Sequence, residues 1–285
     1  MRKGALIMAI PTLFFSGVLL YLVAWNVYLS FLNWSLVNRV PRFVGLGTYS
    51  YLLHQYFFKI GAMHSAIFSL GLIAIGNPLG IFLAGILYFL PNKFRTVMVS
   101  IFLYPLAISM ATNGLIWTWL FNLHLGVDYV LRLMHLPAIP WLTTPTTTIG
   151  ALFLVEVWAY TGLAVLFYLA SFMGVDKSII EAARIDKAGG FKILFKILIP
   201  NSMNGFIVST ALLFLFSFRL FSLPYVIGGG PTNLNLMTLV TYLYYLFYSE
   251  FFSASAATSV IVTMIATAVI IPYALYGIKR WIRRE

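Results

Sequence analysis

The sequence predicts an all-α, polytopic membrane protein with six transmembrane helices and both termini in the cytoplasm. Apolar residues make up 61% of the 285 residues and charged residues only 9%, whereas a soluble domain carries about 25% charged residues. The charged residues are separated by long uncharged stretches, and the basic ones gather in alternate loops. Lipid must therefore be the solvent for most of the chain.

The uncharged stretches are long enough for six spans, because a helix needs about 20 apolar residues to cross a bilayer. Each span is expected to be helical, since a backbone in lipid must satisfy its own hydrogen bonds. The first is too long for a cleaved signal peptide, and no small-residue cleavage pattern follows it. Residues 1–285 then form one transmembrane domain. The predicted spans cover residues 5–31, 61–90, 96–120, 148–172, 202–224 and 251–278.

The basic residues predict the orientation of these spans. With six spans both termini lie on one side, and thirteen basic residues fall on that side against four on the other. Cytoplasmic loops are enriched in Lys and Arg, so both termini are expected in the cytoplasm, in a multi-pass protein of the inner (cytoplasmic) membrane. The same bias accounts for the net charge of +11 without a nucleic-acid partner. The thirteen are Arg2, Lys3, Lys93, Arg95, Lys177, Arg184, Lys187, Lys192, Lys196, Lys279, Arg280, Arg283 and Arg284, and the four are Arg39, Arg42, Lys59 and Arg132.

Several kinds of chemistry are excluded by the composition. The chain has no cysteine, so disulfides, thiolate metal sites and cysteine nucleophiles are ruled out. No GxxxxGK[ST] phosphate-binding loop occurs. The seven acidic residues are scattered, and His124 and His135 lack a metal-ligand spacing. We therefore expect no catalytic residue, no metal site and no cofactor on this chain.

The long inner loop, residues 173–201, holds the most informative pattern. Ser178 and Glu181 have the spacing of a capping box, which predicts a helix over residues 179–188. Gly189 or Gly190 suits the left-handed residue that closes such a helix.

A second, amphipathic helix is predicted to follow, and Pro200 marks the entry to the fifth span. Lys192 and Lys196 share a polar face of that helix. From the residues alone, the loop could also be an ordinary interfacial connector held by basic side chains. The apolar stripe of the second helix consists of Phe191, Leu194, Phe195 and Leu198.

This loop resembles the signature of permease subunits from binding-protein-dependent ABC importers. That signature is Glu-Ala-Ala, three residues, Gly, nine residues, Ile, one residue and Leu-Pro. The chain has Glu181-Ala182-Ala183 and then Ile197-Leu198-Ile199-Pro200 at the family spacing. Ile199 replaces a Leu conservatively. Lys187 stands at the expected Gly, so we expect the two glycines that follow to take over the turn.

Other segments resemble the carbohydrate-uptake branch of that family, the maltose- and glycerol-phosphate-type permeases, and the resemblance spans residues 5 to 280. Each short motif alone is weak, but they occur in the family's order and on the predicted sides of the membrane. They are Phe31-Leu32-Asn33-Trp34, Phe43-Val44-Gly45-Leu46-Gly47-Thr48-Tyr49, Pro105, Ile116-Trp117-Thr118-Trp119-Leu120-Phe121-Asn122, Gly126, Glu181-Ala182-Ala183-Arg184-Ile185-Asp186 and Gly228-Gly229-Gly230-Pro231.

The resemblance implies a mechanism and a set of partners. The fold would be the MetI-like permease fold. Partners would be a second permease subunit, expected to be a different homologous chain, a cytoplasmic ATPase dimer that holds ATP and Mg, and an extracytoplasmic sugar-binding protein. The Glu-Ala-Ala helix would dock into the ATPase and transmit its closure, although Glu181 could also serve only as a cap. The coupling residues would be Ser178, Glu181, Ala182, Ala183, Asp186, Gly189, Gly190, Ile197 and Pro200.

Polar residues inside spans are candidates for the substrate path, because a charge in a span is costly and usually faces a cavity or a partner. Arg219 in the fifth span leads this set, although it could instead reach the headgroups or pair with Glu156. Four tyrosines at 242, 244, 245 and 248 favour an interfacial aromatic belt over a sugar platform. The candidate path residues are Arg219, Ser217, Phe218, Ser222, Glu156, Trp158 and Tyr160.

Three rival functions remain open from the sequence. A secondary transporter would show repeated halves or acid pairs within the membrane, and neither is found. A membrane enzyme would need clustered His, Asp or Glu. An ABC importer for a phosphate ester or an amino acid would share the Glu-Ala-Ala loop, and only the carbohydrate-type outer loops favour sugar.

Overall fold

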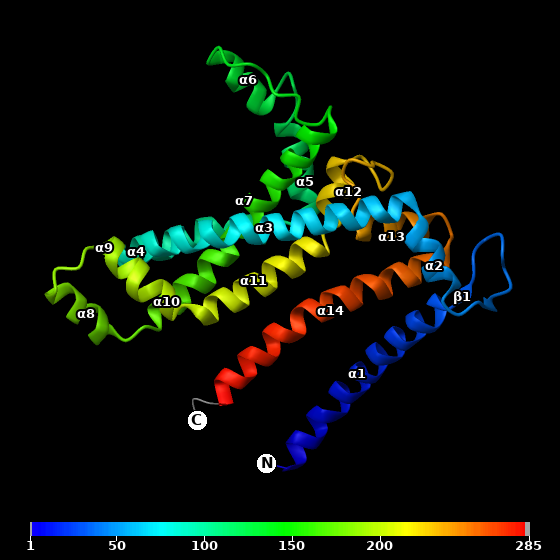
Figure 1. The fold of residues 1–285 in the computed structure, drawn as a ribbon, viewed down its shortest axis with the longest axis horizontal. Coiled ribbons are helices and arrows are strands. Elements are labelled where there is room, and N and C mark those ends of the chain that lie inside the picture. The colour runs from blue at the N-terminus through cyan, green and yellow to red at the C-terminus, as the bar shows by residue number, and fades with distance from the viewer. Residues whose placement is uncertain (1, 283–285) are drawn as a thin grey trace.

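The computed structural model describes residues 2–282 and is mostly helical (Figure 1). Arg283 and Arg284, two of the basic residues used to predict orientation, lie outside the described residues. The elements are α1 (Arg2–Ser30), β1 (Leu32–Asn33), β2 (Arg42–Phe43), α2 (Gly47–His54), α3 (Tyr56–Phe89), α4 (Asn92–Ala107), α5 (Met110–Leu120), α6 (Gly126–Leu133), α7 (Pro145–Met173), α8 (Lys177–Ile185), α9 (Gly190–Ile193), the π-helical η1 (Leu194–Leu198), α10 (Ile199–Asn201), α11 (Met203–Phe218), α12 (Ser222–Ile227), α13 (Leu239–Tyr248) and α14 (Phe252–Ile282).

Within residues 2–282, five helical segments are long and apolar enough to cross a membrane. They are α1, α3, α7, the pair α11 and α12, and α14. The pair α4 and α5 makes a sixth if it counts as one span, but the two helices meet at an angle of 94°. The all-α, multi-span fold class predicted from the sequence is confirmed, whereas the prediction of one uninterrupted helix over residues 96–120 is wrong.

The break between α4 and α5 has a local cause. Pro105 lies in the last turn of α4, where it cannot donate a backbone hydrogen bond. Ser109 then caps α5, accepting a hydrogen bond from the backbone N–H of Thr112 at 3.2 Å. The side chain of Asn113 donates to the carbonyl of Pro105 at 3.0 Å, so the bend leaves that buried carbonyl satisfied.

Helix α7 lies at the centre and packs against α3, α4 and α11. Small residues make the crossings close. A Cβ on Gly80 would lie 2.5 Å from the Cβ of Ala164, and a Cβ on Gly162 would overlap the carbonyl oxygen of Phe102 in α4. Membrane helices use small residues in this way because dispersion between closely packed backbones replaces the hydrophobic effect.

A buried amide ties α3, α7 and α11 together. Asn77 of α3 donates to the hydroxyl of Thr210 at 3.0 Å. Its carbonyl oxygen accepts from Tyr168 of α7 at 3.1 Å and from Ser209 of α11 at 2.8 Å. Each partner would be expensive to leave unpaired inside the core, so this network helps to fix how the three helices are rotated.

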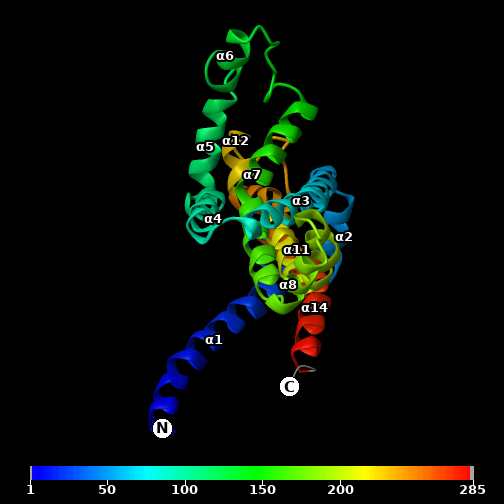
Figure 2. The ribbon, with the colours of Figure 1, turned by 90° about the vertical axis from the view of Figure 1, so that its left-hand side faces the viewer.

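Helix α1 stands apart from this core. Its end contacts α14, and Figure 2 shows it leaning away from the other helices toward its N-terminus. The apolar stretch Ile10–Ser30 is almost wholly exposed in the single chain, with Leu13 at 72% and Leu20 at 71%. Such a surface requires lipid or another apolar protein surface around it.

Candidate functional site

The segment 173–201, which we call the coupling segment after the role that the resemblance implies, begins with a capped helix. The side chain of Asp176 accepts a hydrogen bond from the backbone N–H of Ser178 at 2.9 Å, and α8 starts at Lys177. That backbone N–H, followed by the Ser178 hydroxyl, lowers the pKa of the Asp176 carboxyl. The predicted capping box of Ser178 and Glu181 is therefore wrong. The carboxylate two residues earlier takes the capping position, which Asp fills as well as Ser does.

The end of α8 also differs from the prediction. The left-handed residue is Lys187, with φ of 53°, and neither Gly189 nor Gly190 has a positive φ. Ala188 donates its N–H to the carbonyl of Ala183 at 2.9 Å, and Lys187 donates to Arg184 at 3.0 Å. These two bonds form a Schellman motif. The turn has therefore not moved to the later glycines, and it lies where the family signature has its Gly.

One side of α8 holds it to the protein and the other is open. Ile180 is 5% exposed, and Ala183 is partly buried against the core. Glu181, Ala182 and Ile185 are exposed. The accessible surface of α8 therefore combines a carboxylate, a small residue and an apolar side chain.

In the rest of the coupling segment, only half of the predicted apolar stripe is buried. Leu194 and Leu198 are buried, as predicted for an apolar stripe, whereas Phe191 and Phe195 are exposed and stack with their ring centroids 6.4 Å apart. Residues 194–198 form a π-helical turn, which is wider than an α-helical turn, so the α-helical spacing used for the prediction does not hold there. Pro200 lies in the short α10, before the fifth span.

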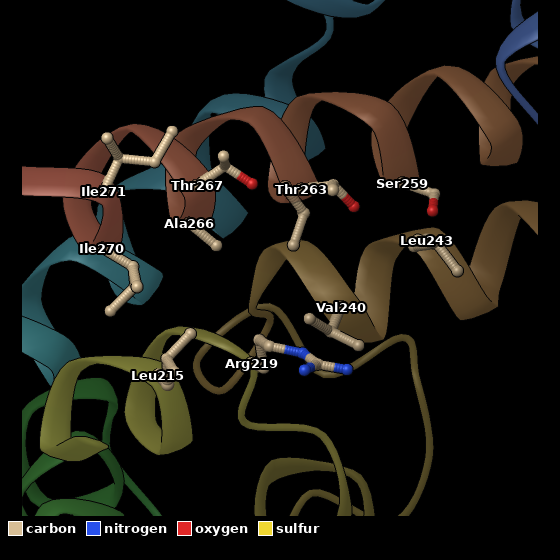
Figure 3. Close-up of a pocket in the computed structure, with 11 residues that line it drawn as sticks. Leu215, Arg219, Val240, Leu243, Ser259, Thr263, Ala266, Thr267, Ile270 and Ile271 are labelled. Carbon is tan, nitrogen blue, oxygen red and sulfur yellow. The ribbon is translucent and has the colours of Figure 1, made fainter. Parts of the chain in front are cut away.

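Arg219 lies where the fifth span breaks. It follows the last residue of α11, and α12 begins at Ser222. Its side chain is exposed and forms no hydrogen bond or ion pair with residues 2–282. It lines two cavities. One, of about 520 Å³, lies between α11, α13 and α14, and the other, of about 430 Å³, lies between α7, α11 and the residues that follow α11 (Figure 3 shows the first).

The structure brings together only part of the predicted substrate path. Ser222 and Tyr160 line the 430 Å³ cavity with Arg219, and Tyr160 stacks on Phe216 at 5.3 Å. Trp158 is 40% exposed and packs edge-on against Trp117.

The remaining predicted path residues are buried in the helix core. Phe218 stacks on Phe214 with centroids 5.1 Å apart. Glu156 and Ser217 are fully buried, and neither the carboxylate nor the hydroxyl forms a hydrogen bond with the part of the chain that the structure describes. Glu156 therefore does not pair with Arg219 in this conformation.

The sequence interpretation missed three hydroxyl residues of the sixth span. Ser259, Thr263 and Thr267 of α14 line the 520 Å³ cavity with Arg219. Their spacing of four residues, which places hydroxyls on one helix face, was the signal that could have revealed them.

Known proteins resemble the chain over its full length. The sequence profile of the family described as "Binding-protein-dependent transport system inner membrane component" matches residues 76–283. The Glucose import system permease protein GlcT of Saccharolobus solfataricus is 58% identical over 285 residues, covering 100% of both chains. The Xylose/arabinose import permease protein XacH of Haloferax volcanii is 26% identical over 82% of this chain and 75% of its own.

The fold also matches a solved structure. A chain of a bacterial alginate ABC transporter, crystallised with its alginate pentasaccharide-bound periplasmic protein, superposes with a TM-score of 0.81. The match covers 94% of this chain and 91% of that chain at 18% sequence identity. With the family profile covering residues 76–283, from within α3 onward, and a relative 58% identical from end to end, this chain belongs to the family of inner-membrane components of binding-protein-dependent transport systems.

Proposed function

We propose that this chain is the permease subunit of an ABC importer for a neutral sugar of the glucose class in the cell membrane. The observation that carries the proposal is the end-to-end similarity to a glucose import permease. A second permease, a cytoplasmic ATPase dimer that holds ATP and Mg, and an extracytoplasmic sugar-binding protein complete the transporter. The loops rich in Lys and Arg, including the coupling segment, face the cytoplasm.

The test of this function is ATP-driven uptake by the assembled transporter in vesicles. With its binding protein, ATPase and second permease, the transporter should accumulate labelled D-glucose, and unlabelled D-glucose should compete. Competition by sugar phosphates but not by free sugars would overturn the substrate class.

Coupling to the ATPase is assigned to α8. Its open side presents Glu181 beside the small Ala182, which lets a partner backbone come close, while Ile180 anchors the helix to the core. Asp176 and the Schellman turn at Lys187 fix both ends of the helix. A short helix with fixed ends can transmit the movement of a docked partner to α7 and to the fifth span.

Reversing the charge at this surface should uncouple the transporter. Glu181→Lys should abolish substrate-stimulated ATP hydrolysis while the chain remains inserted and assembled. Lys93→Glu, a charge reversal at an exposed residue in the first turn of α4, is the matched control and should keep coupled hydrolysis. Normal stimulated hydrolysis in the Glu181→Lys transporter would remove the coupling role.

The substrate path is assigned to the surroundings of Arg219, with Ser222 and Tyr160 as further contacts and Glu156, Ser217, Phe218 and Trp158 packed behind or beside them. Two facts support this. An unpaired arginine is costly in lipid, and a helix break at membrane depth is tolerated where it lines a wet cavity or is buried in protein. The planar guanidinium can donate to several sugar hydroxyls at once.

Removing this guanidinium should impair transport without preventing assembly. Arg219→Ala should lower D-glucose uptake at least about tenfold, the equivalent of one strong charge-assisted hydrogen bond. Arg42→Ala, which changes an exposed arginine of β2, should leave uptake unchanged. Wild-type uptake by Arg219→Ala would place this side chain at the lipid headgroups instead.

A further inference from the structure

Helix α14 presents three hydroxyl side chains to the cavity of about 520 Å³ that Arg219 also lines. Ser259, Thr263 and Thr267 follow one another at four-residue intervals, and Figure 3 shows them along α14, across the cavity from Arg219. Because an α-helix rises 1.5 Å per residue, successive members are about 6 Å apart along the span. We call these three residues the hydroxyl ladder.

The ladder hydroxyls differ from their neighbours in having no hydrogen-bond partner within residues 2–282. In the same helix, Thr258 donates to the carbonyl of Ala254 at 2.9 Å and Ser255 to that of Leu243 at 3.1 Å. Serine and threonine inside helices usually bond back to the preceding turn unless they face water or another partner. The same back-bonding to the fourth preceding carbonyl occurs for Ser69, Thr118 and Thr161 of other spans.

The ladder lies at the edge of the packed face of α14. Thr263 and Thr267 are exposed, whereas Val262 and Ala266, the residues just before them, are buried in the core. Free hydroxyls in contact with lipid would lose hydrogen bonds that they make in water, which costs free energy. Their placement therefore fits a wall that faces water or a hydroxylated ligand.

The cavity combines three kinds of chemistry that suit one class of ligand. Arg219 can only donate hydrogen bonds, while each ladder hydroxyl can donate and accept. Leu215, Val240 and Leu243 supply apolar surface on the α11 and α13 sides. A neutral polyhydroxylated ring can use all three, because its hydroxyls both donate and accept and its C–H faces are apolar.

We propose that the hydroxyl ladder is the wall of the sugar path opposite Arg219, and that a sugar exchanges hydrogen bonds from one ladder hydroxyl to the next as it crosses. This inference rests on the proposed function for the class of ligand. The water-facing position of the ladder is a separate claim, which can be tested independently.

The absence of cysteine from the sequence permits a direct test. Thr263→Cys and Thr267→Cys, each in the assembled transporter in vesicles, should react with a charged, water-soluble methanethiosulfonate reagent. Ile265→Cys is the matched control, because Ile265 is partly exposed at the same depth but lies about 200° around the helix from Thr263. The ladder cysteines should react at least about tenfold faster, since an apolar environment suppresses the reactive thiolate.

Protection of the ladder cysteines from labelling tests whether the ladder contacts the sugar. D-glucose with its binding protein should slow the labelling of both ladder cysteines. If neither ladder cysteine reacts faster than Ile265→Cys, the hydroxyl ladder does not face water, whatever substrate the transporter carries. If both react but D-glucose gives no protection in a transporter that imports it, the ladder does not contact the sugar. If the transporter imports no D-glucose at all, the proposed function fails, and with it the assignment of a sugar to the ladder, although fast labelling would still support a wet wall.

A second set of variants separates hydrogen bonding from packing. Thr263→Val keeps the shape of the side chain but removes the hydroxyl, so D-glucose uptake should fall several-fold. Thr263→Ser keeps the hydroxyl and should retain uptake. Thr258→Val, in which a buried, back-bonded hydroxyl is removed from the same helix, should also retain it. Equal uptake by Thr263→Val and Thr263→Ser would overturn the proposal.

Discussion

At the scale of the residue, the turn after α8 places a side chain where glycine is favoured. Lys187 has φ of 53°, a conformation that brings Cβ close to the following carbonyl in L-residues. The turn nevertheless keeps both bonds of a Schellman motif. The interactions around the turn therefore compensate for backbone strain at Lys187.

Lys187→Gly should relieve this strain. The expected gain in local stability is about 0.5–1 kcal/mol, the cost of the left-handed conformation less the extra backbone entropy that glycine loses on folding. Hydrogen exchange of the backbone amides of residue 187 and Ala188 measures this gain in stability, because a more stable turn exchanges more slowly. Lys187→Ala, which removes the charge but keeps Cβ, should give no gain. An equal gain from alanine would assign the effect to the charge rather than to the backbone.

At the scale of the element, the position of α7 depends on close helix contacts that its glycine residues permit. Gly162 brings α7 against the backbone of α4, so that a Cβ there would overlap the carbonyl oxygen of Phe102. Gly150, in the same helix, has nothing within 4 Å of its Cβ position. The position of α4 against α7 depends on this close crossing.

Gly162→Ala should separate α4 from α7 and destabilise the fold by about 1–3 kcal/mol, as overpacking of a close contact does. Gly150→Ala is the matched control in the same helix. It should be neutral or slightly stabilising, because alanine is the better helix former. The measurement is the thermal unfolding midpoint of the purified transporter. Equal midpoints for the two variants would contradict the close crossing.

At the scale of the whole molecule, the chain exposes more apolar surface than one subunit in water can tolerate. The side chains of α1 from Ile10 onward contact little of the protein, and the open side of α8 has no partner within the described residues. Both features agree with a subunit that acts within lipid and among other chains.

The purified single chain should neither bind nor hydrolyse ATP. Its sequence contains no phosphate-binding loop, whose backbone N–H groups would hold the phosphates. Nucleotide binding and phosphate release by the chain, freed of its partners, are the measurements. Hydrolysis that follows this chain through purification, with the partner ATPase absent, would contradict the assignment of ATP to a separate subunit.

The sequence by itself determined the fold class and the position of the functional loop. Span length and the need to satisfy the backbone in lipid act locally along the chain, so uncharged stretches were enough to predict an all-α protein with several spans. Glu181, Ala182 and Ala183 lie on a short helix as predicted, because this helix depends on nearby residues. The choice of Asp176 as cap was also local, but Asp176 and Ser178, two residues apart, are both residue types that favour the capping position.

Only the tertiary structure decided which distant residues face one another. Pro105 and Ser109 favour a break near Ile108 locally, but the direction of α5 after the break depends on how α5 packs against α12 and α4 against α7. Arg219, Ser222 and Tyr160 share a cavity while Glu156 and Ser217 are buried away from it, because burial depends on the rotation of each helix against its neighbours. The hydroxyl ladder became visible as a wall only when α14 was placed opposite Arg219, since helix rotation is set by packing between spans rather than by hydrophobicity along one of them.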